Sequence, residues 1–324
     1  MKQFFFLFIA LFAVCSCSAQ SADTIPLKIN RFDVVLFHYL ENNDDRSVFS
    51  DEYRPFLDVF GRQVLQIGSV DSTGFEDRLQ QYFSHPTLRK LYQDEIQLFS
   101  TIDSFEKELF KGMSLLLTEF PELKLPVMYM HVSGLNQNVV VTDSLLSISA
   151  DKYLGADYAL YEEFFYDYER QMMSPDRIVP DYLLGFLMAN FPIEGIEEML
   201  LDRILYEGKL RYILSKILPE RNEWEYVGYT KEQYAWCMKH QSRIWKTILE
   251  QKHLYTSNYF LVSQYLNPAP YTAFLPAESP GRVGMWVGYR IIASLMKHHP
   301  EISLPELMEM RDAQELLKLS RYKG

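Results

Sequence analysis

A single block of β-forming sequence in the middle of this chain limits the folds that it can adopt. The block contains three runs rich in β-branched and other apolar residues, VMYMHV at 127–132, VVVTD at 139–143 and LLSIS at 145–149. Turn-like segments separate the runs, as expected for short strands of one sheet. On both sides of the block, apolar residues recur at three- and four-residue steps, the spacing of amphipathic helices. The sequence therefore predicts a mainly α fold with one small β-sheet of three strands, an α+β class.

The helical patterns fall into two groups that flank the predicted sheet. They start at Asn30 and then cover about 51–65, 86–98, 102–119, 175–190, 194–217, 230–250, 282–298 and 303–320. Prolines separate many of these segments, and the sequence shows no internal repeat, low-complexity tract or flexible linker. We therefore expect one globular domain over 27–324, built from a helical lobe at 27–120, the sheet at 125–150 and a second helical lobe at 151–324.

The first residues have the pattern of a cleavable secretory signal. Lys2 is followed by an uninterrupted apolar run at 4–14, which is shorter than the roughly 20 apolar residues that cross a bilayer. A lipoprotein signal peptidase requires an aliphatic residue three positions before its cysteine and a small residue directly before it. Val14 and Ser16 meet this requirement for Cys17. The sequence therefore predicts lipid attachment at this cysteine.

Cleavage before Cys17 would remove a signal peptide at 1–16 and leave a lipidated tether at 17–26. Two alternatives stay open, which are ordinary cleavage after Ala19 and an uncleaved anchor. The expected location is the cell envelope, as a membrane-anchored lipoprotein. Ser18 follows the lipid-bearing cysteine and does not argue for retention in the inner membrane, so we expect the outer membrane rather than the inner one.

The chain is acidic, with 32 Lys and Arg residues against 43 Asp and Glu residues and a formal net charge of −11. Negative charge repels nucleic acid and anionic lipid head groups, so we expect no nucleic-acid partner. Membrane contact is expected through the N-terminal lipid instead, with further protein partners in the cell envelope. After cleavage, Cys237 is the sole cysteine besides Cys17. It is expected to be a small buried apolar residue, not a disulfide partner.

No catalytic or metal-binding motif stands out in the sequence. The seven histidines include no pair four residues apart, so the HExxH motif of zinc peptidases is missing. The GxSxG motif of serine hydrolases is missing too, and we expect neither a metal nor a cofactor. Glu207 is the most unusual acidic residue, because it lies between apolar residues in ILYEGKLRY. It belongs either to a solvated helix face or to a partly buried pair with a specific partner.

A glycine-containing segment, SPGRVGMWVGYRII, starts the helical pattern at 282–298. Gly284 and Gly288 are four residues apart and therefore share one helix face, where small residues let another element approach closely. The lysine and hydroxyl of a phosphate-binding P-loop are missing. The segment, which also carries Arg282 and Trp286, either packs closely against a neighbour or lines a small groove for a ligand or partner.

Several segments together resemble the gliding-motility lipoprotein family GldB of Bacteroidetes. The most extensive is LPVMYMHVSGLNQNVVVTDSLLSISADKYLG at 125–155. The others, in chain order, are MMSPDRIVPDYLLGFL at 172–187, LLDRILYEGKLRYILSKILP at 200–219, GYTKEQYAWC and RIWKTILEQKHLYTSN within 228–258, and the C-terminal SPGRVGMWVGYRI and SLPELMEMRDAQELLKLSRYKG. With the signal peptide, the resemblance covers essentially the whole chain. Their order and spacing carry it, since no single motif is decisive.

The resemblance implies a zincin-like architecture with a degenerate metal site. The family is similar to zinc peptidases in which a small sheet precedes a helix with two histidines and a glutamate, and a later helix adds an acidic ligand. Here Asp181 and Gly185 would replace the histidines, Tyr182 would replace the general base, and Glu207 would be the later acid. Catalytic zinc needs three protein ligands and an activated water. Glycine offers no ligand atom, and tyrosine is a poor base at neutral pH.

The sequence and the resemblance together favour a protein that is not an enzyme. The expected function is that of a membrane-anchored structural or assembly component, resembling those of gliding motility and type IX secretion. One alternative is a peptide- or partner-binding protein that reuses a former peptidase cleft, with an unpaired edge strand near 127–142. The other is an atypical metal-dependent peptidase that uses Asp181, Glu207 and a histidine from elsewhere in the chain.

Overall fold

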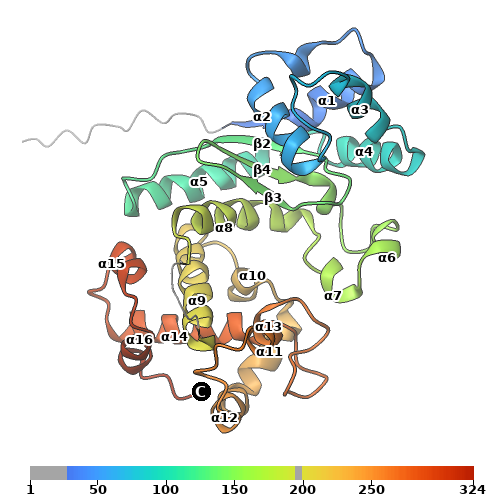
Figure 1. Cartoon of the computed structure of the whole chain (residues 1–324). Coiled ribbons are helices and arrows are strands. Elements are labelled where there is room, and N and C mark those ends of the chain that lie inside the picture. The colour runs from blue at the N-terminus through green and yellow to red at the C-terminus, as the bar shows by residue number, and fades with distance from the viewer. Residues whose placement is uncertain (1–27, 194–198) are drawn as a thin grey trace, which may run out of the picture.

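The sheet lies in the middle of the molecule, between two groups of helices (Figure 1). The computed structural model describes residues 28–193 and 199–324. Within them, one sheet has the strand order β1-β2-β4-β3, and the strands are β1 (Ile29–Arg31), β2 (Val127–His131), β3 (Val139–Val141) and β4 (Leu145–Ser149). Strands β1, β2 and β4 are parallel, whereas β3 is an edge strand that pairs antiparallel with β4. The predicted α+β class is thereby confirmed.

Strand β1 corrects the prediction of three strands and of a helix that starts at Asn30. Ile29 pairs with Met128 and Asn30 pairs with Tyr129 in a parallel ladder, and the first helix starts only at Phe32. A three-residue strand carries too little alternation to be recognised from its own sequence. Its pairing with a partner about a hundred residues away depends on the tertiary fold.

One face of the sheet packs against the N-terminal helices, which Figure 1 shows in blue and teal. These helices are α1 (Phe32–Glu41), α2 (Arg54–Val59), α3 (Phe75–Tyr82) and α4 (Pro86–Leu98), and a π-helical turn at Phe60–Val64 extends α2. Tyr129, Val140 and Leu145 from the sheet share an apolar core with Phe32 and Phe56. Strand residues alternate between faces, so their neighbours in sequence point the other way.

The opposite face of the sheet packs against α5 (Asp103–Glu119) and α8 (Ile178–Asn190). Met128, Met130, Leu146 and Ile148 lie in this second core with apolar residues of both helices, including Leu183. Because both faces of β4 are covered, all five of its residues are buried. The helix predicted at 175–190 is confirmed, except that its first turn is a 3-10 turn at Pro175–Arg177.

The C-terminal lobe is built around two long helices, α9 (Leu200–Ile217) and α14 (Val283–His298), which lie against each other (Figure 1). Shorter helices surround them, namely α10 (Glu223–Val227), α11 (Lys231–Lys239), α12 (Gln241–Glu250), α13 (Tyr259–Leu266), α15 (Leu304–Glu309) and α16 (Ala313–Ser320). Two further short helices, α6 (Tyr161–Phe164) and α7 (Asp167–Arg170), connect the sheet to α8.

Two long helices predicted for this lobe are each divided in the structure. The segment at 230–250 divides at His240, and that at 303–320 divides at 310–312. Ser303 caps the first of the last two helices and Asp312 caps the second, because each side chain accepts a main-chain N–H of the first turn. The apolar residues keep their helical spacing across each break, so the sequence pattern does not show where one helix ends and the next begins.

The N-terminal predictions fall outside the structure. The signal peptide at 1–16, Cys17 and the tether at 17–26 all lie outside the described residues. Among the helices in the described ranges, none is long and apolar enough to cross a membrane.

Candidate functional site

A pocket of about 390 Å³ lies between the edge of the sheet and the C-terminal lobe. We call it the arginine pocket, because Arg177, Arg211 and Arg282 all line it. Asn138 and Val139 contribute the sheet edge, and α8 contributes Asp181 and Gly185. Three of the residues singled out from the sequence, Asp181, Gly185 and Arg282, therefore meet in one cavity.

Asp181 is held on the pocket wall by two donors. Its Oδ1 accepts a hydrogen bond from Nη2 of Arg177 at 2.6 Å, and its Oδ2 accepts one from the hydroxyl of Tyr153 at 2.9 Å. Arg177 is one helical turn before Asp181 and also donates to the main-chain oxygen of Glu225 at 2.5 Å. Burial and then the charge of Asp181 raise the pKa of Tyr153 well above its ordinary value, so this hydroxyl stays protonated as a donor.

Tyr182 and Gly185 serve the packing of α8 against the sheet. Tyr182 is fully buried, and its hydroxyl donates to the main-chain oxygen of Tyr129. An ideal Cβ at Gly185 would lie 2.9 Å from Cγ1 of Val139, so only glycine fits there without a shift. The position expected to hold a general base therefore lies in the core, whereas Gly185 borders the arginine pocket.

Glu207 forms an ion pair with Arg211, which lies one helical turn later on α9. Both side chains are largely buried, with exposed fractions of 12% for Glu207 and 6% for Arg211. Arg211 also donates to the main-chain oxygen of Glu207 at 3.1 Å and contacts Sδ of Met285 at 3.2 Å. Arg211 lines the arginine pocket, whereas Glu207 is not one of its lining residues. Asp181 and Glu207, the two predicted acidic positions, are thus each paired with an arginine.

Arg282 is the residue just before α14, and its main chain has a left-handed φ of 59°. The surrounding loop is fixed by the Tyr229 hydroxyl, which donates to the oxygen of Gly281 at 2.7 Å, and by Thr272, whose Oγ1 accepts the N–H of Val283 at 3.1 Å. A left-handed conformation costs a non-glycine residue about 1 to 3 kcal/mol, and the surrounding structure has to hold it in place.

Among the described residues, the guanidinium of Arg282 contacts neutral acceptors. Its Nη2 donates to the main-chain oxygen of Gly228 at 3.0 Å and contacts Sδ of Met172 at 3.3 Å. No carboxylate in the described parts of the chain forms an ion pair with it. Burial lowers the pKa of Arg282, and the nearby charges of Arg211 and Arg177 lower it further. An anionic group in this pocket would remove that unfavourable charge interaction.

Gly284, Trp286 and Gly288 lie in the packing of α14 and not in a groove. Trp286 is fully buried. An ideal Cβ at Gly284 would lie 2.9 Å from the oxygen of Tyr265, and one at Gly288 would lie 1.6 Å from the oxygen of Ile204. Of the two alternatives predicted for this segment, close packing describes these three residues. Arg282 alone faces a cavity.

Sequence reasoning missed several residues of the arginine pocket. Arg177 and Arg211 were not singled out, although each follows a simple pattern, an opposite charge four residues away on the same helix. Lys152 was also missed. It lines the pocket, and its Nζ lies 4.1 Å from the ring centre of Phe165. No local pattern could have brought Lys152, Arg211 and Arg282 together, because they come from three distant segments.

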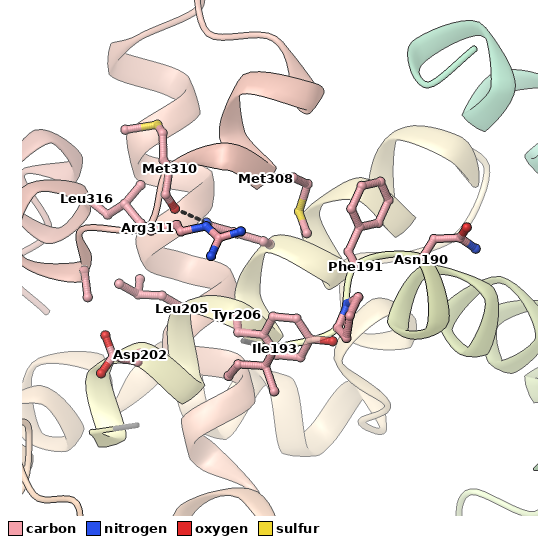
Figure 2. Close-up of a pocket in the computed structure, with 13 residues that line it drawn as sticks. Asn190, Phe191, Ile193, Asp202, Leu205, Tyr206, Met308, Met310, Arg311 and Leu316 are labelled. Atoms are coloured by element: carbon pink, nitrogen blue, oxygen red, sulfur yellow. Dashed lines mark hydrogen bonds between the residues drawn. The ribbon is translucent and has the colours of Figure 1, made fainter. Parts of the chain in front are cut away.

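A second pocket of about 400 Å³ lies between α9 and the α15–α16 segment. Figure 2 shows Met308 and Arg311 on one side and Tyr206 of α9 on the other. The buried Lys209 donates to the main-chain oxygen of Met310 at 2.5 Å. Burial, and to a smaller extent the charge of Arg311, lower the pKa of Lys209 to about 8. None of the residues predicted as a site lines this pocket.

Within residues 28–193 and 199–324, no group of three or more His, Cys, Asp or Glu side chains is placed to hold a metal ion. A family model described as gliding motility protein GldB matches residues 17–324 of the chain. The chain belongs to this family. Membership implies a function related to gliding motility, and the model's short label, which includes "lipo", suggests a lipoprotein.

The searches of curated proteins and of solved structures each found no match. The family model by itself confirms the family resemblance drawn from the sequence. The further similarity to zinc peptidases is not borne out by these comparisons.

Proposed function

We propose that this GldB-family protein is a lipid-anchored component of the cell envelope that acts in gliding motility as a structural or assembly part, without catalysing a reaction. The family match supports the link to gliding and starts at Cys17, the residue predicted to carry the lipid. The acyl chains of a lipoprotein cysteine would provide stable anchoring, because more than one chain is needed for lasting membrane attachment.

The pairing of Asp181 is the observation that best supports a non-enzymatic role. Both of its carboxylate oxygens already accept hydrogen bonds, one from Arg177 and one from Tyr153. A metal ligand at this position would have to lose these bonds. It would also place a divalent cation close to Arg177, and like charges at short distance repel strongly where solvent is scarce. Glu207 is paired with Arg211 in the same manner.

Metal analysis and peptide hydrolysis test the non-enzymatic part of this proposal. Mature protein, purified in detergent, is expected to contain zinc far below one ion per chain and to leave peptide substrates intact. Stoichiometric zinc together with hydrolysis that Asp181→Asn abolishes would establish the alternative of an atypical metal-dependent peptidase.

Palmitate labelling in the native host tests the anchor. Wild-type protein is expected to incorporate the label and to sediment with membranes, and Cys17→Ser is expected to do neither. Cys15→Ser serves as the matched control, because Cys15 follows the bulky Val14 and fits the cleavage rule less well. Gliding by a deletion strain that carries Cys17→Ser at a normal protein level would contradict a need for the anchor.

A further inference from the structure

We propose that the arginine pocket and the free edge of β3 together bind an extended, acidic peptide segment of a partner protein. One carboxylate of that segment would pair with Arg282. The inference rests on the proposed function, since it names the chemistry of a partner for an assembly component.

The hydrogen-bonding pattern of β3 leaves one edge of the sheet open. The N–H of Ser149 donates to the oxygen of Asn138 at 2.8 Å, and the N–H of Thr142 donates to the oxygen of Leu145 at 2.9 Å. In an antiparallel ladder the residues that face the partner strand alternate along the chain. The main-chain groups of Val139 and Val141 therefore point away from β4, toward the free edge. Such an edge can accept the backbone of an added strand.

Basic side chains outnumber acidic ones in the lining of the arginine pocket, with Lys152, Arg177, Arg211 and Arg282 against Glu169 and Asp181, although the whole chain carries a net charge of −11. Arg177 and Arg211 each have a carboxylate partner, whereas Arg282 and Lys152 form no ion pair with any described carboxylate. A planar guanidinium matches a carboxylate group in geometry and charge. The best complement to this pocket is therefore an acidic side chain or a chain terminus.

Val139 links the open edge to the pocket. Its main chain belongs to the free edge, and its side chain contacts the α8 face at Gly185 and lines the pocket. A strand added beside β3 would lie about 4.8 Å away, with alternate side chains on the same face as Val139. Those side chains would enter the arginine pocket. Met172 and Met188 also line it, and flexible methionines adapt to varied apolar neighbours.

A displayed library of random octapeptides, selected on the mature protein in detergent, tests the proposal. Recovered peptides are expected to contain Asp or Glu at one fixed position and to lack proline beside it. For a recovered peptide made synthetically, Arg282→Gln should weaken binding at least tenfold. Arg243→Gln, which alters an exposed arginine of α12 that does not line the pocket, should leave affinity unchanged. Recovered peptides without an acidic preference, or an affinity that Arg282→Gln does not change, would overturn the proposal.

A second arm changes the peptide and so avoids any folding defect of a variant. Replacing the acidic residue of the peptide by its amide should lower the affinity for the wild type by the same tenfold. The affinity for the Arg282→Gln variant should not fall further with this replacement. In an added strand, every second peptide N–H bonds to the sheet. Methylating that alternate set of nitrogens should abolish binding, whereas methylating the other set should not. Val139→Pro should also prevent binding, because proline lacks the N–H that points toward the free edge. The fold should be preserved, because this N–H does not bond to β4. Binding that survives both changes would exclude strand addition.

Inorganic phosphate serves as a rival probe. If phosphate binds at the pocket and no acidic peptide does, the pocket is a small-anion site and the proposal fails. Mass spectrometry of the bound peptides separates this inference from the proposed function. Intact peptides agree with both, whereas cleaved peptides would overturn the non-enzymatic role and leave the binding site in place.

Discussion

Gly208 of α9 and Gly288 of α14 bring the main chains of the two helices into contact. An ideal Cβ on Gly208 would lie 2.3 Å from the carbonyl carbon and oxygen of Gly288, and one on Gly288 would lie 1.6 Å from the oxygen of Ile204. Main-chain atoms cannot move aside as a side chain can. Two glycines distant in sequence therefore set the separation of the helices that form the C-terminal core.

Gly288→Ala should strongly destabilise the protein. The added methyl would force α14 away from α9 and disturb the buried residues on both sides, at a cost of about 3 kcal/mol. Urea unfolding followed by circular dichroism measures the change in the free energy of unfolding.

Gly185→Ala is the matched control for this prediction. Its Cβ would press on the side chain of Val139, not on main chain, and alanine is about 1 kcal/mol better than glycine inside a helix. The two effects largely cancel, so a change of less than about 1 kcal/mol is expected. Similar unfolding midpoints for the two variants would show that the helix contact is looser than the structure indicates.

The stability of the fold should fall in mild acid because of His131. This residue is fully buried, and its Nδ1 forms a hydrogen bond with Oγ of Ser147 at 2.7 Å. Burial lowers its pKa from 6.5 to about 3. Below pH 6.5 the unfolded chain binds a proton on His131 that the folded chain does not, so folding stability is lost as the pH falls toward 3.

His131→Asn cannot titrate and should lack this pH dependence. Between pH 7 and pH 4.5 the wild type is expected to lose roughly 2 to 3 kcal/mol relative to the variant, at about 1.4 kcal/mol per pH unit. Denaturant unfolding at both pH values gives the comparison. Parallel pH profiles for the two proteins would mean that His131 is accessible to protons in the folded state.

Glu95 should have the opposite effect, with stability lost as the pH rises. It is fully buried beside Asp33, which forms an ion pair with Arg31 at 2.5 Å. Burial, and then the charge of Asp33, raise the pKa of Glu95 well above its ordinary value. The unfolded chain releases this proton above about pH 4.5 while the folded chain keeps it, so stability falls as the pH increases through the native pKa.

Glu95→Gln supplies a neutral side chain of the same shape. Its stability relative to wild type should therefore improve between pH 5 and pH 7, by up to about 1.4 kcal/mol per pH unit. Glu122→Gln, at an exposed position, controls for the change in net charge. A constant difference between Glu95→Gln and wild type over this range would show that Glu95 is ionised in the fold.

Much of the architecture follows from the sequence because it is encoded locally. The alternation in β2 and the apolar period of α14 each reflect which faces are buried, and both elements lie where the sequence predicts them. Strand β1 was missed because its three residues are too few to show a strand pattern, and they become a strand only by pairing with β2. The break at His240 was missed because the apolar period continues across it.

The candidate site was predicted less completely than the fold. Asp181 and Gly185 came from the family resemblance, and Arg282 came from its glycine-rich segment. All three line one pocket, but Tyr182 and Glu207 do not. The resemblance placed these two by analogy with a metal site, whereas Tyr182 bonds to the sheet and Glu207 pairs with Arg211. For Glu207, the ion pair matches the alternative of a partly buried, specific pair that its apolar sequence context had left open. The clustering of three arginines depends on how α8, α9 and α14 meet, which no local pattern encodes.

The ion pair between Arg177 and Asp181 should stabilise the fold, and its removal should separate a structural from a catalytic carboxylate. Asp181→Asn leaves the largely buried guanidinium of Arg177 without its anion and weakens the acceptor of Tyr153. The expected loss is about 2 to 3 kcal/mol. Arg177→Met should cost a similar amount, and the double variant should cost clearly less than the sum of the two, with a coupling of about 1 kcal/mol or more. Urea unfolding of the four proteins completes the cycle. A poised catalytic carboxylate would give a different result, in which Asp181→Asn preserves or raises stability and the two substitutions are simply additive.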